Sequence, residues 1–407
     1  GWTDNSTTAT FSAITTAGMF LGALVGGIIG DKTGRRNAFI LYEAIHIASM
    51  VVGAFSPNMD FLIACRFVMG VGLGALLVTL FAGFTEYMPG RNRGTWSSRV
   101  SFIGNWSYPL CSLIAMGLTP LISAEWNWRG LLLIPAILSL IATALAWRYF
   151  PESPRWLESR GRYQEAEKVM RSIEEGVIRQ TGKPLPPVVI ADDGKAPQAV
   201  PYSALLTGVL LKRVILGSCV LIAMNVVQYT LINWLPTIFM TQGINLKDSI
   251  VLNTMSMFGA PFGIFIAMLV MDKIPRKTMG VGLLILIAVL GYIYSLQTSM
   301  LLITLIGFFL ITFVYMYVCY ASAVYVPEIW PTEAKLRGSG LANAVGRVSG
   351  IAAPYAVAVL LSSYGVTGVF ILLGAVSIIF AIAIATIGIE TKGVSVESLS
   401  IDAVANK

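Results

Sequence analysis

Residues 30–36 read Gly-Asp-Lys-Thr-Gly-Arg-Arg and join two apolar stretches, residues 8–29 and 37–56. Each stretch has about 20 residues, and a helix that rises about 1.5 Å per residue can then cross a hydrocarbon core about 30 Å thick. A charged connection this short between two such stretches turns the chain at a membrane surface. The pattern predicts a helical protein that crosses the membrane more than once.

The composition of the whole chain agrees with this prediction. Of the 407 residues, 56% are hydrophobic and 12% are charged, which is about half the charged share of ordinary soluble domains. This composition excludes a water-soluble globular protein. A transmembrane barrel would show strands of about ten residues that alternate apolar and polar positions, and the sequence lacks that alternation. We therefore predict an all-α membrane protein.

The distribution of basic residues predicts the orientation. Most of the 28 Lys and Arg residues lie in connections on one side of the predicted spans, and basic connections stay in the cytoplasm. We expect a multi-pass protein of the plasma membrane, in a bacterium the inner membrane, and no nucleic-acid partner. Eleven apolar stretches serve as predicted spans, at residues 8–29, 37–56, 61–84, 95–121, 130–149, 211–239, 249–271, 279–296, 300–325, 339–361 and 367–388.

An internal repeat organises these spans. The loop at residues 271–277, Met-Asp-Lys-Ile-Pro-Arg-Lys, repeats the loop at residues 30–36, so that Asp272 follows Asp31 by 241 positions. A second motif recurs at nearly the same interval, because Glu86, Pro89, Arg93 and Gly94 return as Glu328, Pro331, Arg337 and Gly338. Both copies lie on the cytoplasmic side, which is typical of transporters built from parallel repeats.

The repeat predicts two helical bundles in a six-plus-six pattern, of which eleven spans are present. The counterpart of the span at 211–239 would precede residue 1, so we expect this chain to be a fragment without the first helix and inactive in transport. The predicted domains are an N-terminal bundle of five spans (1–150), a cytoplasmic connector with an amphipathic helix (151–206), a C-terminal bundle of six spans (207–390) and a cytoplasmic tail (391–407). In the connector helix, Tyr163, Ala166, Met170 and Ile173 fall on one face.

Five motifs together resemble the major facilitator superfamily. They are residues 30–36, their degenerate second copy at 271–277, Arg66-Phe-Val-Met-Gly70, Pro151-Glu-Ser-Pro-Arg-Trp-Leu157 and Glu390-Thr-Lys-Gly393. The run at 151–157 looks like the sugar porter branch and its metabolite-transporting relatives. The resemblance implies two six-helix bundles around a central site, alternating access and, often, proton-coupled uptake.

The sequence departs from the sugar porter pattern at two places. Pro275 stands where the first loop has Gly34, so the second loop could latch less well. Sugar porters also usually carry a paired-Gln motif in the helix that opens the second half, whereas this chain has Asn225, Gln228 and Tyr229 there. That stretch looks closer to organic-acid symporters.

The cytoplasmic charges are candidates for a latch between helix ends. A carboxylate in a short loop can face a helix N-terminus or an arginine, and the alternative is a charge cluster that only sets topology. We expect Glu86 to pair with Arg93, Glu328 with Arg337, and Glu152 with Arg155. The complete predicted set is Asp31, Arg35, Arg36, Glu86, Arg93, Glu152, Arg155, Asp272, Glu328 and Arg337.

Polar side chains inside the spans are candidates for a substrate site. Such groups could form a midplane pocket that binds hydroxyl or carboxylate oxygens; the alternative is polar packing between helices. Arg347 could hold a substrate carboxylate, or it could form a structural ion pair or extend to the nearer surface. The predicted set is Asn105, Tyr108, Asn225, Gln228, Tyr229, Asn233, Tyr315, Asn343 and Arg347.

Glu43, His46 and Arg66 are the candidates for proton coupling. Glu43 and His46 lie three residues apart and share one helical face, where they could exchange a proton; helix packing is the alternative. The glycines at spacing four, Gly18, Gly22 and Gly26 in one span and Gly70 and Gly74 in another, predict close helix contacts instead of sites.

The predicted function is secondary active transport of a small polar metabolite, namely a sugar, sugar acid or organic acid, with proton symport. A uniporter of the same solutes and a non-transporting nutrient receptor remain the alternatives. The sequence contains no phosphate loop, metal-ligand cluster or nucleophile triad, so we expect neither an enzyme nor a cofactor. We expect the protein to work as a monomer in the lipid bilayer.

Overall fold

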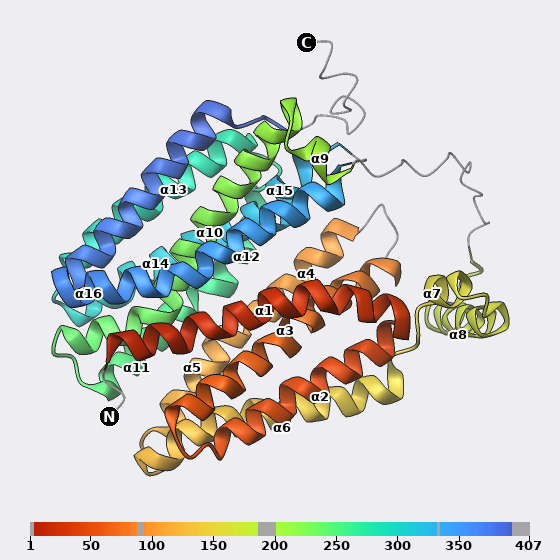
Figure 1. Cartoon of the computed structure of the whole chain (residues 1–407), viewed down its shortest axis with the longest axis horizontal. Coiled ribbons are helices and arrows are strands. Elements are labelled where there is room, and N and C mark those ends of the chain that lie inside the picture. The colour runs from red at the N-terminus through yellow and green to blue at the C-terminus, as the bar shows by residue number, and fades with distance from the viewer. Residues whose placement is uncertain (1–3, 88–92, 186–200, 332–333, 393–407) are drawn as a thin grey trace. The chain divides into compact units, whose positions relative to one another are not determined.

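The computed structural model describes residues 4–87, 93–185, 201–331 and 334–392, and within these ranges every regular element is a helix (Figure 1). The helices of the first half are α1 (Asn5–Thr33), α2 (Arg35–Ala54), α3 (Met59–Tyr87), α4 (Arg93–Asn105), α5 (Ser107–Leu118) and α6 (Ala124–Tyr149). The connector holds α7 (Pro154–Ser159), α8 (Tyr163–Thr181) and α9 (Tyr202–Leu205). The second half contains α10 (Gly208–Thr241), α11 (Leu246–Met257), α12 (Gly259–Val270), α13 (Arg276–Ser295), α14 (Met300–Val318), a π-helix (Cys319–Tyr325), α15 (Val326–Glu328) and α16 (Lys335–Ile387).

The helices account for the eleven predicted spans. In the described ranges, nine helices are long and apolar enough to cross a membrane. One of them, α16, has 53 residues and breaks at Gly365, whose φ of 64° and ψ of −159° are not helical, so it contains two spans. The remaining predicted span, residues 95–121, corresponds to α4 and α5, which are separate helices that meet at Trp106.

The contacts within the chain define two compact units. One unit contains residues 1–13, 94–131 and 197–407, and the other contains residues 14–93 and 132–196. The first unit thus groups α4 and α5 with the second half of the sequence, since α5 packs against α11. The division by sequence repeat, with a boundary at residue 150, stays a prediction.

In the second unit, small residues let α1 and α3 pack backbone to backbone. A Cβ atom added to Gly22 would overlap the carbonyl oxygen of Val71, and one added to Gly74 would overlap that of Met19. Gly18 and Gly70 make similarly close approaches. The prediction that these glycines mark close helix contacts is confirmed, because no larger side chain fits between the two backbones.

In the first unit, α10 lies in a core formed with α13, α14 and α16. The side chains of Trp234, Tyr315 and Tyr317 are almost completely buried there. The hydroxyl of Tyr317 donates a hydrogen bond to the carbonyl of Val220 at 3.2 Å, which fixes the level at which α14 crosses α10. This core places the polar side chains of α10 and α14 beside one another.

The connector forms the predicted amphipathic helix, α8, but its buried face differs from the prediction. Ala166 is buried against Trp156 and Leu157 of α7, with Val169 beside them. Tyr163 is 69% exposed and Met170 is 41% exposed. The buried face therefore centres on Ala166 and leaves these two residues exposed.

Candidate functional site

A carboxylate from the connector caps the helix that follows the first charged loop. Glu152 accepts hydrogen bonds from the backbone N–H of Arg35 at 2.7 Å and of Arg36 at 3.2 Å. These N–H groups belong to the first turn of α2, where no intrahelical partner exists and the helix dipole favours negative charge. Gly34 has a φ of 96°, and the Glu152 carboxylate occupies the space where a Cβ would lie. Glycine is thus required here twice, for backbone conformation and for space.

The same loop is held by a side chain of α7 and by the side chain of the residue that follows α7. The indole N–H of Trp156 and the guanidinium of Arg160 each donate to the backbone carbonyl of Asp31 at 2.7 Å. The Asp31 carboxylate itself forms an ion pair with Arg35 at 2.7 Å. The run at 151–157 therefore closes onto the loop at 30–36.

The second half repeats this arrangement with different residues. Glu390, just after α16, accepts from the backbone N–H of Arg276 at 2.8 Å and of Lys277 at 3.1 Å, at the start of α13. Arg276 also forms a two-pronged ion pair with Glu328, with distances of 3.0 and 3.1 Å, and contacts Asp272 at 3.1 Å. The side chain of Arg276 is only 7% exposed, so its charge is compensated by carboxylates from two elements.

The segment after α16 is fixed by further contacts. The Tyr325 hydroxyl donates to the carbonyl of Ile389 at 2.8 Å and accepts from its N–H at 2.9 Å. Thr391 donates to Glu328 at 2.6 Å. These contacts connect the end of α16 with the end of the π-helix and the start of α13.

The predicted pairings within the cytoplasmic motifs differ from those in the structure. Glu328 pairs with Arg276 instead of Arg337, whose guanidinium lies 5.2 Å from the ring centroid of Tyr202. Glu152 binds backbone N–H groups, and Arg155 is exposed. Tertiary packing brings closer partners to both carboxylates than their sequence neighbours. The side chains of Glu86 and Arg93 lie outside what the structure describes.

Two participants were not among the predicted site residues. The sequence marks Arg276 only as part of the repeated loop and Glu390 only as part of the motif at 390–393. A signal for Glu390 existed, because it follows Glu152 by 238 positions, close to the interval of 241 between Asp31 and Asp272.

An aromatic and polar cluster lies inside the first unit. The rings of Tyr108 on α5 and Tyr315 on α14 meet edge to face, with centroids 5.2 Å apart. Tyr315 is 1% exposed, and its hydroxyl has no hydrogen bond of regular geometry with any described group. The hydroxyl of Tyr108 and the amide of Gln228 on α10 approach it, and Tyr229 interacts with it electrostatically. A buried, unsatisfied hydroxyl among polar neighbours is a place where a ligand oxygen can bind.

Three predicted asparagines instead bond to their own helices. The side-chain amides of Asn105, Asn225 and Asn343 donate to the carbonyl four residues earlier, at 2.7, 2.7 and 2.9 Å. Asn225 is buried where α16 comes closest to α10 at Gly346. Asn343 is exposed, and Asn233 is partly buried on α10. The structure thus brings together Tyr108, Gln228, Tyr229 and Tyr315, but does not join Asn105 or Asn343 to them by a contact.

Arg347 follows Gly346 on α16 and is partly buried. Among the described residues, no carboxylate lies within ion-pairing distance of its guanidinium. The alternative of a structural ion pair therefore has no support from the described part of the chain. A partly buried arginine in a membrane helix is costly unless it faces a partner or a cavity.

The proton-coupling candidates lie in the second unit. His46 Nδ1 is 3.7 Å from Glu43 Oε2 on α2, and Glu43 is buried. Arg66 is partly buried on α3. Among the residues that the structure describes, no group of histidine, cysteine and acidic side chains could hold a metal ion.

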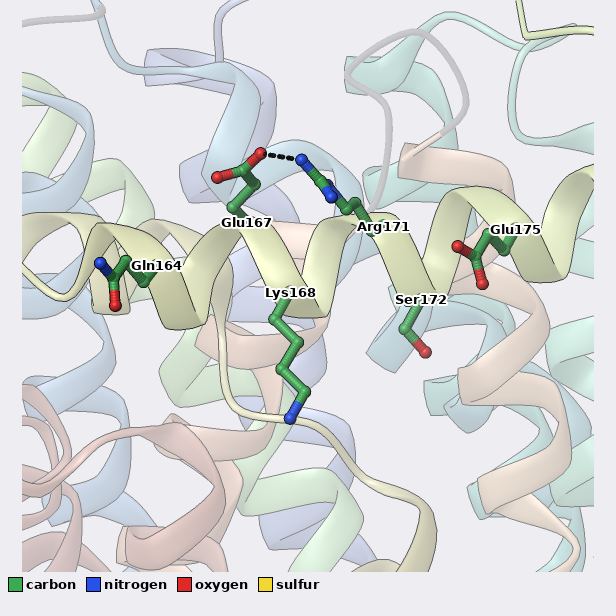
Figure 2. Close-up of a pocket in the computed structure, with 6 residues that line it drawn as sticks. All are labelled: Gln164, Glu167, Lys168, Arg171, Ser172 and Glu175. Atoms are coloured by element: carbon green, nitrogen blue, oxygen red, sulfur yellow. Dashed lines mark hydrogen bonds and ion pairs between the residues drawn. The ribbon is translucent and has the colours of Figure 1, made fainter.

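Figure 2 shows a hollow on the connector, along one side of α8. All of its lining residues come from this one helix, and Glu167 and Arg171 pair there at 2.6 Å. The hollow lies outside the membrane-spanning helices, so it is not a site for a transported solute. Its lining residues are Gln164, Glu167, Lys168, Arg171, Ser172 and Glu175.

The repeated spans, the two capped loops and the buried polar cluster define a polytopic helical transporter of the major facilitator superfamily. Residues 2–403 match the profile of the family described as "Sugar (and other) transporter", and the chain belongs to this family. It is a multi-pass protein of the bacterial inner membrane, and its relatives are transporters and not enzymes.

Two curated proteins of Escherichia coli (strain K12) are similar over nearly the whole chain. One, named "Putative metabolite transport protein YdjK", is 99% identical over 407 residues, which are 100% of this chain and 89% of that protein. The other, named "Inner membrane metabolite transport protein YdjE", is 44% identical and covers 98% of this chain and 88% of that protein.

Solved structures of the E. coli xylose transporter XylE share the fold. A partially occluded inward-open form gives a TM-score of 0.76 at 18% identity, covering 96% of this chain and 89% of that one. A second structure, titled as a proton:xylose symporter, gives a TM-score of 0.66 at 20% identity, covering 96% and 88%. The sequence-based assignments of family, fold class and membrane are confirmed.

Proposed function

We propose that this protein is a proton-coupled secondary transporter of a small polar metabolite that carries hydroxyl groups and a carboxylate, such as a sugar acid or another organic acid. Membership of a family of sugar and metabolite transporters supports the general class. The narrower substrate class is supported by the buried polar cluster around Tyr315 and by Arg347. The likeness to a proton:xylose symporter is a likeness of fold, and it supplies the precedent for coupling.

One observation carries the proposal. Tyr315 holds its hydroxyl in the interior of the first unit without a regular hydrogen bond, although Tyr108 and Gln228 approach it. A buried hydroxyl whose contacts have poor hydrogen-bond geometry is only partly satisfied. A substrate hydroxyl or carboxylate oxygen that binds among these three side chains can complete its hydrogen bonding, so the cluster stabilises the bound substrate.

Arg347 extends the proposal from a sugar to an acid. A guanidinium offers two parallel donors that match a carboxylate, and Arg347 has no acidic partner among the described residues. Gly346, its neighbour, packs against Leu221 and Asn225 of α10, three residues before Gln228. Arg347 therefore lies on the turn of α16 that contacts the polar helix α10.

The capped loops supply the mechanical part of the proposal. Glu152 and Glu390 each connect the end of one span to the start of another, on the cytoplasmic side. Charge-assisted hydrogen bonds of this kind can form and break between two states. We assign to them the task of holding each half as a rigid body while the access to the substrate alternates.

The test uses full-length protein in liposomes and matched pairs of solutes. Each pair is a neutral sugar and the sugar acid that differs from it by the carboxylate, for example glucose and gluconate. We expect counterflow and an inward proton movement with the acid and not with the sugar. Tyr315→Phe, which removes only the hydroxyl, should weaken substrate binding by about 1–3 kcal/mol. Tyr292→Phe on the exposed face of α13 is the control.

Other outcomes identify other functions. Transport of the sugar but not the acid would overturn the substrate class. Counterflow without proton movement would indicate a uniporter, and binding without counterflow or uptake would indicate a nutrient receptor.

A further inference from the structure

Glu43 and His46 form an isolated pair in the interior of α2. Their atoms Oε2 and Nδ1 are 3.7 Å apart, which is beyond a regular hydrogen bond. Both atoms are buried, and neither has a hydrogen-bond partner among the described groups. Glu43 is 8% exposed as a residue, and His46 is the chain's single histidine. The two side chains therefore have only each other as polar partners at these atoms.

The helices that pack against this pair can be placed from their contacts with α2. A Cβ on Gly72 of α3 would lie 3.0 Å from the backbone nitrogen of His46. Two contacts join α2 to α6. Arg36 of α2 donates to the carbonyl of Trp147 of α6, and Gly53 of α2 lies opposite Leu132 of α6. Helices α2 and α6 are therefore antiparallel, and Glu43 is level with the turn of α6 that contains Thr143. The Thr143 hydroxyl donates to its own helix, to the carbonyl of Ser139 at 2.8 Å.

Few ionisable groups face the pair. Arg66 precedes Gly72 by six residues and is thus about 9 Å farther along α3. The Tyr42 hydroxyl donates to the carbonyl of Gly26 at 2.9 Å. The other ionisable residues of α1, α2, α3 and α6 in this unit are Cys65 on α3 and residues near the helix ends, namely Asp31 and Lys32 on α1, Arg35 and Arg36 on α2, Asp60, Glu86 and Tyr87 on α3, and Arg148 and Tyr149 on α6.

The low polarity of this environment limits the charge states of the pair. Without a proton on either site, the pair has one negative charge, and with both sites protonated it has one positive charge. Each state places an uncompensated charge in the interior, which is expensive. With one proton, the pair is neutral overall, whichever side chain carries it. The singly protonated pair is thus the charge state that costs least to bury.

We propose that Glu43 and His46 are a proton-binding site that takes up one proton from water on one side of the membrane and releases it on the other side during transport. This inference rests on the proposed proton symport and names the groups that perform it. The step forms and breaks only an N–H or O–H bond, with water as donor and acceptor, so it needs no other reactant. Release requires that α2 reaches a state in which water or Arg66 compensates the remaining carboxylate.

The first experiment separates coupling from transport. Full-length wild type, Glu43→Gln, His46→Asn and the control Ser49→Ala are reconstituted in liposomes, with gluconate as the probe. Ser49 is one turn along the same helix, and its hydroxyl bonds only to backbone carbonyls of α2. We expect counterflow in all four proteins, and both proton movement and accumulation against a gradient in wild type and Ser49→Ala alone.

The second experiment measures the site without transport. A difference acid–base titration of purified full-length wild type against the Glu43→Gln/His46→Asn double variant counts protons bound by the pair. We expect the wild type to bind one proton per molecule more than the variant as the pH is lowered.

The outcomes separate the two proposals. Counterflow without proton movement in the wild type contradicts the proposed symport. Proton movement that persists in Glu43→Gln and His46→Asn, or identical titration curves for wild type and double variant, overturns the assignment of the proton site.

Discussion

Glu152 and Glu390 occupy equivalent positions in the two halves of the protein. Each stands directly after the last span of its half, and each accepts hydrogen bonds from the first two backbone N–H groups of the helix that follows a repeated charged loop. The partner residues are 117 positions from Glu152 and 114 positions from Glu390. The repeat thus extends to the spatial arrangement of a charged loop, the helix that follows it and the carboxylate that caps this helix. The motifs around the two carboxylates differ in sequence.

The first prediction concerns the pH dependence of the Glu390 cap. Burial raises the pKa of Glu390, but hydrogen bonds from Arg276, Lys392 and Lys277 and the charge of Arg276 outweigh it and hold the pKa below its usual value. Because the folded-state pKa is the lower one, this carboxylate stabilises the fold fully above the unfolded-state pKa. That contribution is lost as the pH falls through the lowered value.

Glu390→Gln should therefore lose less stability than wild type on acidification from about pH 6 to about pH 3. Thermal unfolding of full-length protein in detergent at a series of pH values measures this difference. Parallel curves for the two proteins would show that the Glu390 carboxylate does not contribute to the acid sensitivity. Asp248→Asn, at the start of α11 on the opposite side of the membrane, is a control for general loss of negative charge.

The second prediction compares the two repeated aspartates. The Asp31 carboxylate is 71% exposed and that of Asp272 is 90% exposed, so neither ion pair should contribute more than about 1 kcal/mol to stability. Asp31→Asn should reduce transport sharply while expression and substrate binding persist. Asp272→Asn should cost less, because Arg276 keeps its two contacts with Glu328. Near-normal uptake by both variants would show that the two aspartates only set the membrane topology.

The third prediction tests the packing of α1 on α3. Gly22→Ala forces a methyl group onto the backbone of Val71, and overpacking of this kind costs about 1–3 kcal/mol. Gly27→Ala is the matched control on the same helix, because its Cβ would lie 3.9 Å from the nearest atom, a side-chain carbon of Val78. Thermal unfolding should separate the two variants. Equal melting temperatures would mean that α1 can move away from α3 at Gly22 without loss of stability.

The fourth prediction concerns Arg347. If its guanidinium binds a substrate carboxylate, Arg347→Lys keeps the charge but loses the two-pronged geometry, and affinity for an acid should fall by about 1–3 kcal/mol. Arg347→Gln should lose more. Calorimetric titration of stable variants measures both effects, and the matched neutral sugar is the control ligand. An unchanged dissociation constant for Arg347→Gln would remove this residue from the site.

The sequence by itself determined the class of fold and the repeat, and it predicts the orientation. Apolar stretches of about 20 residues, short basic connections and a motif repeated after 241 positions are local or periodic features, and the bilayer converts them directly into spans and sides. The same holds for Gly22 and Gly74, because spacing by four residues places small side chains on one helical face.

Only the tertiary structure decided which side chains meet. The sequence placed Glu328 with its neighbour Arg337, but packing of α13 against the end of the π-helix brings Arg276 to Glu328 instead. It also named Asn105 as a candidate for the substrate site, and the structure shows that its amide donates to the carbonyl of Ser101 in its own helix. A polar residue in an apolar helix shows that a partner is needed. Its identity depends on the rotation and level of each helix against the next, which only the packing of large side chains such as Tyr315 and Tyr317 fixes.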